Sequence, residues 1–119
     1  MKNIVIIDDE VEIASMIEKF LSKSGEYKVK VYNNPLTALN SMNLNTDVVL
    51  LDIMMPQMNG LELLPKLKEK YPDIDVIMMT AYSTLDKVLE SHRHGAMHYL
   101  MKPFSSLNEI TKKIEEISN

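Results

Sequence analysis

The 119-residue sequence contains no cysteine, and this absence excludes both a disulfide framework and a thiolate metal site. It fits a reducing compartment, so we expect a cytoplasmic location. No apolar run approaches the roughly 20 residues of a membrane-spanning helix, and the first residues form a strand-like segment instead of a signal peptide. We therefore expect a soluble chain with no membrane partner.

An excess of positive charge is also missing. The sequence has 13 Lys and Arg against 17 Asp and Glu, a formal net charge of −4, with no basic stripe of the kind that binds nucleic acid. Direct contact with DNA or RNA is not expected. With 45% hydrophobic residues, the chain can bury one ordinary core but is short for two, so we predict one domain over residues 1–119.

Five short segments have the composition of β-strands, and helical spacing separates them. Three are continuous apolar runs, typical of strands buried on both faces, whereas residues 27–32 alternate apolar residues with Lys28 and Lys30, typical of an edge strand. The predicted strands are residues 3–7, 27–32, 48–51, 76–79 and 96–101.

Five helices are predicted between and after these strands. Gly25 and Gly95 are helix stops, Asn34-Pro35 is a helix start, and Pro65 is expected to kink its helix. The first predicted helix starts at residue 11, and the next three cover residues 35–42, 60–70 and 84–94. The last helix carries Leu107, Ile110, Ile114 and Ile117 on one face. Such alternation predicts right-handed crossovers, a parallel sheet and helices on both faces, a doubly wound α/β domain.

Polar side chains follow four of the predicted strands. They are Asp8 and Asp9, Asp52, Thr80 and Lys102. Each alone could be a helix cap or a solvated group, but ligands of such sheets bind outside the carboxyl ends of the strands. Three carboxylates close together require a cation, and an all-oxygen set that also leaves room for phosphate suits Mg²⁺ better than Ca²⁺.

This residue set indicates phosphoryl chemistry. A carboxylate beside Mg²⁺ can act as a nucleophile toward phosphorus, because the cation screens the repulsion between two anions. Lys102 and the Thr80 hydroxyl are the remaining donors for phosphoryl oxygens.

Four motifs, taken in order, resemble the receiver domain of two-component response regulators, close in length to the single-domain chemotaxis type. They are IIDDE at 6–10, LLDIMMPQMNG at 50–60, MTA at 79–81 and YLMKPF at 99–104. The resemblance implies a flavodoxin-like sheet of order 2-1-3-4-5 with five helices. It also implies a phosphorelay role, in which a histidine kinase or phosphotransfer protein is the phosphodonor.

The resemblance assigns roles to single residues. Asp52 is the phosphoacceptor, and Asp9, Asp52 and the Met54 carbonyl ligate Mg²⁺, or Mn²⁺ as a substitute, with Asp8 acting through a metal-bound water. Lys102 pairs with Asp52 before phosphorylation and with the phosphoryl group after it.

The resemblance also implies a switch. Thr80 moves inward to bond a phosphoryl oxygen, Tyr99 turns into the vacated space, and the Lys102–Pro103 bond is cis. The output face consists of the fourth helix, fifth strand and fifth helix, including Lys87, Glu90, Tyr99, Met101 and Phe104. Its partner is not encoded in the motifs, and the chain is a monomer or a homodimer promoted by phosphorylation.

Two further positions bear on how long a phosphoryl group persists. In the family, side chains two residues past the phosphoacceptor and two past the Thr set the dephosphorylation rate; here they are Met54 and Tyr82. Neither is an acid or an amide that could orient water. We therefore predict a longer-lived phosphorylated form than in fast chemotaxis switches.

Three alternatives remain open. The first is a haloacid-dehalogenase-like phosphatase, although the position of its second Asp is occupied by Met54. The second is a non-switching interaction module, and the third is the input domain of a longer regulator. His92, His94 and His98 have the wrong spacing for a helical metal site and are interpreted as a polar helix end.

Overall fold

The computed structural model describes residues 1–80 and 98–117 and contains a five-stranded parallel sheet. The order β2-β1-β3-β4-β5 confirms the predicted doubly wound topology. The strands lie within one residue of the predicted bounds, except that residues 96–97 lie outside the described part. They are β1 Lys2–Ile7, β2 Tyr27–Tyr32, β3 Val48–Asp52, β4 Asp75–Thr80 and β5 His98–Met101.

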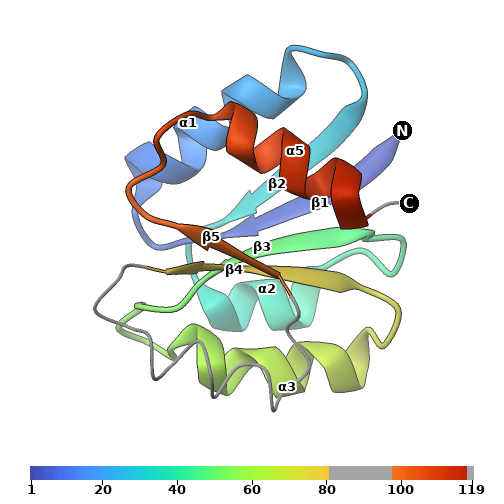
Figure 1. Cartoon of the computed structure of the whole chain (residues 1–119). Helices are drawn as coiled ribbons and strands as arrows, with labels where there is room; N and C mark the ends of the chain where they lie inside the picture. The colour runs from blue at the N-terminus through green and yellow to red at the C-terminus, as the bar shows by residue number, and fades with distance from the viewer. Residues whose placement is uncertain (81–97, 118–119) are drawn as a thin grey trace.

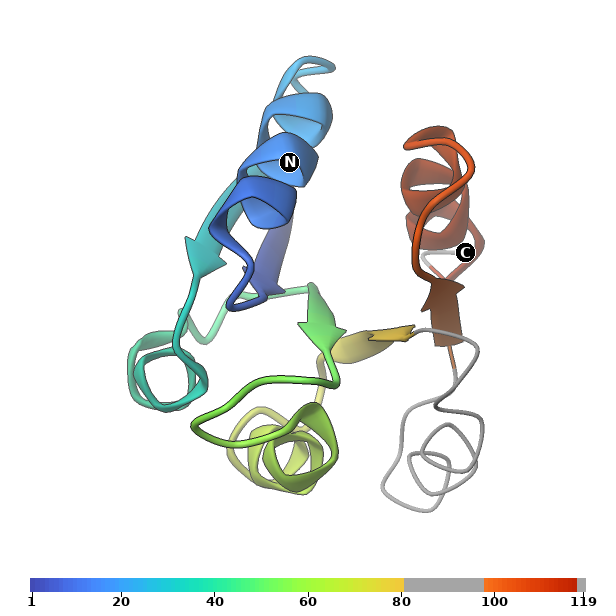
Figure 2. The ribbon, with the colours of Figure 1, turned by 90° about the vertical axis from the view of Figure 1, so that its left-hand side faces the viewer.

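Four helices are described, and they cover both faces of the sheet. In Figure 2, α1 and α5 lie on one face, whereas α2 and α3 lie on the other. Their bounds are α1 Val11–Ser22, α2 Pro35–Ser41, α3 Gly60–Lys70 and α5 Asn108–Ile117. The helix predicted at 84–94 and its stop at Gly95 lie outside the described residues.

Local sequence signals explain where the helices start and stop. The Asn34 side chain accepts hydrogen bonds from the backbone N–H groups of Leu36 and Thr37, and Pro35 occupies the first turn. Gly25, just past α1, has a φ of 73°, a conformation that other residues adopt only with strain. Pro65 lies inside α3, which continues to Lys70. The kink expected at Pro65 stays a prediction.

The apolar strands are buried on both faces, and this fixes the position of their ends. Along β1, Val5 and Ile7 belong to the core cluster under α2 and α3, whereas Ile4 and Ile6 belong to the cluster under α1 and α5. A shift of one residue in β1 would exchange the two sets, so packing on both sides holds the strand register. The residues that follow the strands therefore project from a rigid platform.

Among the residues that the structure describes, no helix has the length and apolar content needed to cross a membrane.

Candidate functional site

The carboxyl ends of β1, β3, β4 and β5 bring four of the predicted polar residues to one edge of the sheet. The strand register pairs Asp52 with Met79, and Thr80 with Met101. The Lys102 backbone N–H donates to the Thr80 carbonyl oxygen at 2.6 Å, so β5 delivers Lys102 beside the end of β4. Figure 2 looks onto this edge.

Lys102 forms ion pairs with three acids of the site. Its ammonium lies 2.9 Å from Asp8 Oδ2, 3.3 Å from Glu10 Oε1 and 3.3 Å from Asp52 Oδ1. The pair with Asp52 has the geometry of the contact that the family resemblance implies. The shorter contact to Asp8 and the additional contact to Glu10 were not predicted.

Asp8 and Asp52 are buried carboxylates, 0% and 4% exposed. The pKa of Asp52 is raised to about 7, first by burial and then by the negative charge of Asp8, even though the charge and hydrogen bond of Lys102 oppose the rise. Burial by itself lowers the pKa of Lys102, but the hydrogen bond to Asp8 and the charge of Asp52 outweigh burial, so this pKa is raised. One ammonium therefore does not neutralise both acids, and the site favours additional positive charge.

The acids fit a divalent cation. Asp8, Glu10 and Asp52 each offer a carboxylate oxygen, and these oxygens lie within 4.8 Å of one another. Asp9 lies outside this cluster, and its Oδ1 is buried and, within the described part of the chain, has no hydrogen-bond partner. A buried carboxylate oxygen without a donor is costly unless a cation or water satisfies it. The donor set is all oxygen, as a hard cation such as Mg²⁺ prefers.

Glu10 is the site residue that sequence reasoning missed. It follows Asp8 and Asp9 directly and occupies the N-cap position of α1, where its side chain makes no capping hydrogen bond. Its backbone N–H instead donates to Asp8 Oδ1 at 2.9 Å, and its side chain contacts Lys102. The only signal in the sequence was a third consecutive acid after the first strand.

The loop after β3 holds the backbone of Asp52 in place. The Gly60 N–H donates to the Ile53 carbonyl oxygen at 2.8 Å, which closes the loop at the start of α3. A Cβ atom at Gly60 would lie 3.0 Å from the Cα of Ile53 and closer still to the carbonyl oxygen of Asp52. Met54, in the same loop, is 58% exposed.

The two predicted switch residues occupy different environments. Thr80 is buried at the end of β4, and Tyr99 is half-buried against the core cluster under α2 and α3. Tyr82, predicted to influence phosphoryl lifetime, lies outside the described residues, as do Lys87, Glu90, His92 and His94. His98 belongs to β5, and no histidine joins the metal-type cluster within residues 1–80 and 98–117.

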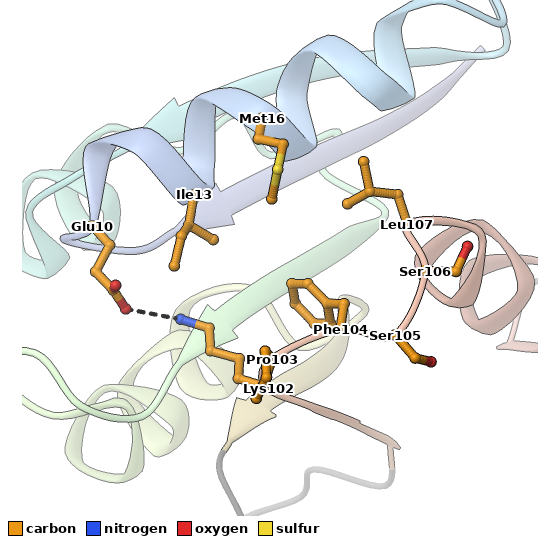
Figure 3. A pocket seen from close by; sticks show the side chains of 9 residues that line it. All are labelled: Glu10, Ile13, Met16, Lys102, Pro103, Phe104, Ser105, Ser106 and Leu107. Carbon is orange, nitrogen blue, oxygen red and sulfur yellow. Dashed lines mark hydrogen bonds and ion pairs between the residues drawn. The ribbon is translucent and has the colours of Figure 1, made fainter.

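Phe104, which was predicted to belong to the output face, contacts the core from the side of α1 and α5. Phe104 packs with the core cluster under α1 and α5 and lines a groove between α1 and the segment that follows β5 (Figure 3). The Lys102–Pro103 bond is cis. The segment after it leads toward α5, and the Phe104 ring lies on the α1 side (Figure 3). The groove has a volume of about 570 Å³, and its apolar wall consists of Ile13, Met16, Phe104 and Leu107.

The fold and the strand-end acids define a class of small α/β domain with an acidic, cation-type site at the carboxyl edge of its sheet. A family model for the response regulator receiver domain matches residues 4–115. The chain belongs to the response regulator receiver domain family.

Curated relatives are larger than this chain. It is 41% identical over 104 residues to the DNA-binding transcriptional regulator NtrC of Proteus hauseri, covering 86% of this chain and 22% of that protein. It is 36% identical over 106 residues to the transcriptional regulatory protein MalR of Bacillus subtilis, covering 87% of this chain and 45% of that protein. The chain therefore spans less than half of either relative.

Solved receiver domains share the whole fold. A CheY-like response regulator receiver domain from Methanospirillum hungatei has a TM-score of 0.87 at 30% identity, covering 98% of this chain and 93% of that one. A two-component response regulator from Clostridium difficile has a TM-score of 0.89 at 22% identity, covering 99% and 96%, which supports the fold alone. These neighbours confirm the predicted flavodoxin-like receiver fold.

Receiver domains are phosphorylation switches of two-component systems that bind Mg²⁺ at an acidic cluster and interact with histidine kinases or phosphotransfer proteins.

Proposed function

We propose that this receiver domain accepts a phosphoryl group on Asp52 from a phosphohistidine of a histidine kinase or phosphotransfer protein, or from a small phosphodonor. The observation that supports this proposal most strongly is the placement of a buried Asp52 carboxylate within 3.3 Å of Lys102 and beside two further acids. A carboxylate at the end of a central strand, with the Lys102 ammonium next to it, is positioned for nucleophilic attack on phosphorus.

In the proposed step, an Asp52 carboxylate oxygen forms a bond to phosphorus while the bond from phosphorus to the donor nitrogen breaks. The released imidazole keeps the bonding electron pair and takes a proton from solvent. Lys102 holds phosphoryl oxygens by charge and hydrogen bonding. Asp9, Asp52 and the Met54 carbonyl would hold Mg²⁺, or Mn²⁺ in its place, with Asp8 acting through water; the cation supplies charge neutralisation between the two anions.

The proposed response to phosphorylation uses Thr80 and Tyr99. A phosphoryl group adds roughly −1.5 to −2 charge at neutral pH, so hydrogen-bond donors must move to meet it. The Thr80 hydroxyl is placed at the end of the neighbouring strand, and Tyr99 lies on β5 in register with Met78. We propose that their movement alters the output face, whose described part contains Tyr99, Met101, Lys112 and Glu116.

The output partner, which the motifs do not identify, would bind this face. A second copy of the domain is one such partner, bound after phosphorylation.

The groove of Figure 3 is proposed as the docking site of the protein phosphodonor. Lys102 and Glu10 line the groove and also belong to the acidic site, so a protein seated there lies next to Asp52. Met16 is 45% exposed on its wall and offers apolar surface to such a partner.

The test of phosphoryl acceptance is intact mass after incubation with phosphoramidate and Mg²⁺. We expect a single phosphate adduct that is labile in base, that is absent in Asp52→Asn and that is absent when a chelator is added. No adduct on a folded wild-type chain would favour the non-switching interaction module. Sustained turnover of an external phosphoester would instead favour the phosphatase.

A further inference from the structure

Glu10 occupies a position where a capping residue is expected, yet its side chain serves another contact. As the N-cap of α1, it makes no side-chain capping bond, although a capping side chain at this position stabilises a helix. Its carboxylate lies 3.3 Å from the Lys102 ammonium instead, and this contact is drawn in Figure 3. The residue therefore belongs to the chemistry of the site as well as to the helix.

The three acids around Lys102 differ in their access to solvent. The side chains of Asp8 and Asp52 are 0% and 6% exposed, whereas the side chain of Glu10 is 55% exposed. A divalent cation that binds beside the two buried acids repels the ammonium that they now share. Glu10 is the neighbouring carboxylate that can keep Lys102 paired while the buried pair is released, because it lies on the solvent side of the same ammonium.

We propose that Glu10 is a positioning residue that receives the Lys102 ammonium when a divalent cation enters beside Asp8 and Asp52. This inference rests on the proposed function in one respect, since the cation is the one that serves phosphoryl transfer. Without Glu10, Lys102 remains on the two buried carboxylates and competes with the cation for them. Glu10 thus acts on cation binding through Lys102.

The experiment is a calorimetric titration of the full chain with Mg²⁺ alone, with no phosphodonor. Glu10→Gln keeps the side-chain volume and removes the charge, and we expect it to weaken Mg²⁺ binding by roughly threefold to tenfold. Glu12→Gln is the matched control: it removes an exposed acid from the same first turn of α1, outside the cluster, and we expect unchanged affinity.

A double-mutant cycle with Lys102→Met tests whether Glu10 acts through Lys102. In the Lys102→Met background, Glu10→Gln should change Mg²⁺ affinity no more than Glu12→Gln does. An equal loss in both backgrounds would show that Glu10 contributes only its field and would overturn the proposal. If Lys102→Met does not fold, Glu10→Asp replaces the cycle: the charge is kept but the shorter side chain does not reach Lys102, so weakened binding supports the proposal and wild-type binding overturns it.

The same samples separate this inference from the proposed function. Altered Mg²⁺ affinity in Glu10→Gln without any adduct on Asp52 would contradict phosphoryl acceptance and leave the role of Glu10 standing. If the wild type forms the adduct on Asp52 but Glu10→Gln binds Mg²⁺ as tightly as the wild type does, phosphoryl acceptance is supported and the role of Glu10 is contradicted.

Discussion

The Lys102 ammonium lies 2.9 Å from Asp8 but 3.3 Å from Asp52, so the lysine is held most closely by an acid that is not the proposed phosphoacceptor. Both acids are buried, and they share one compensating charge. The pKa of Asp52, raised to about 7 by burial and by the charge of Asp8, reflects this shortage. The stability of the protein should therefore depend on pH and on divalent cations.

Asp52→Asn should stabilise the protein when divalent cations are absent. Because the pKa of Asp52 is higher in the folded state than its unfolded value of about 4, protonation favours folding. This contribution is fully present below about pH 4 and is lost as the pH rises through about 7. We expect the variant to gain about 2 kcal/mol in unfolding free energy at pH 8 and little at pH 4, measured by urea denaturation. Asp73→Asn, an exposed acid, should gain nothing at either pH.

Mg²⁺ should make the wild type more stable than Asp52→Asn at pH 8. A ligand that binds only the folded state stabilises it by about 2.7 kcal/mol at a hundredfold excess over its dissociation constant. We expect Mg²⁺ to raise the melting temperature of the wild type at pH 8 and to leave that of Asp52→Asn nearly unchanged. Equal shifts in the two proteins would place the cation elsewhere.

Gly60→Ala should damage the site beyond its cost in stability. Its new methyl group collides with the backbone of Asp52 and Ile53, so the loop must move Asp52. Gly25→Ala is the control, since it strains a residue with a φ of 73° where nothing lies within 4 Å, at a cost of about 1 kcal/mol. We expect slower adduct formation from phosphoramidate in Gly60→Ala alone, with both variants kept well below their melting temperatures.

Met54→Asn should shorten the lifetime of the phosphorylated form. An amide at this exposed position can orient a water molecule toward phosphorus, which the thioether cannot. We expect autodephosphorylation to accelerate by roughly tenfold, and further when Tyr82→Glu is added, as followed by loss of the phosphate mass. An unchanged rate in the double variant would contradict our interpretation of these two positions.

Met16→Lys should separate protein phosphodonors from small ones. The charge enters the apolar wall of the groove, so phosphoryl transfer from a phosphorylated histidine kinase should fall by about tenfold or more. The rate with phosphoramidate should stay unchanged. Leu36→Lys is matched in exposure, 45% in both, and lies on α2, away from the groove. Equal losses in the two variants would argue against docking in the groove.

The sequence by itself determined the fold class and four residues of the site. Continuous apolar runs specified strands buried on both faces, and their alternation with helices predicted a parallel sheet whose carboxyl edge carries Asp8, Asp52, Thr80 and Lys102. These predictions depended on local periodicity and on a topological rule, both of which can be applied to a sequence alone.

Only the tertiary structure decided which partners these residues take. The path of the chain after β5 carries Phe104 to the α1 side, and no periodicity within residues 99–104 specifies that turn. The preference of Lys102 for Asp8 is a contact of 2.9 Å against 3.3 Å to Asp52 and to Glu10, and such small differences depend on how the ends of separate strands are placed. Burial that removes water from Asp8 and Asp52 comes from all the packed layers together, so the balance of charge in the site is a property of the folded chain.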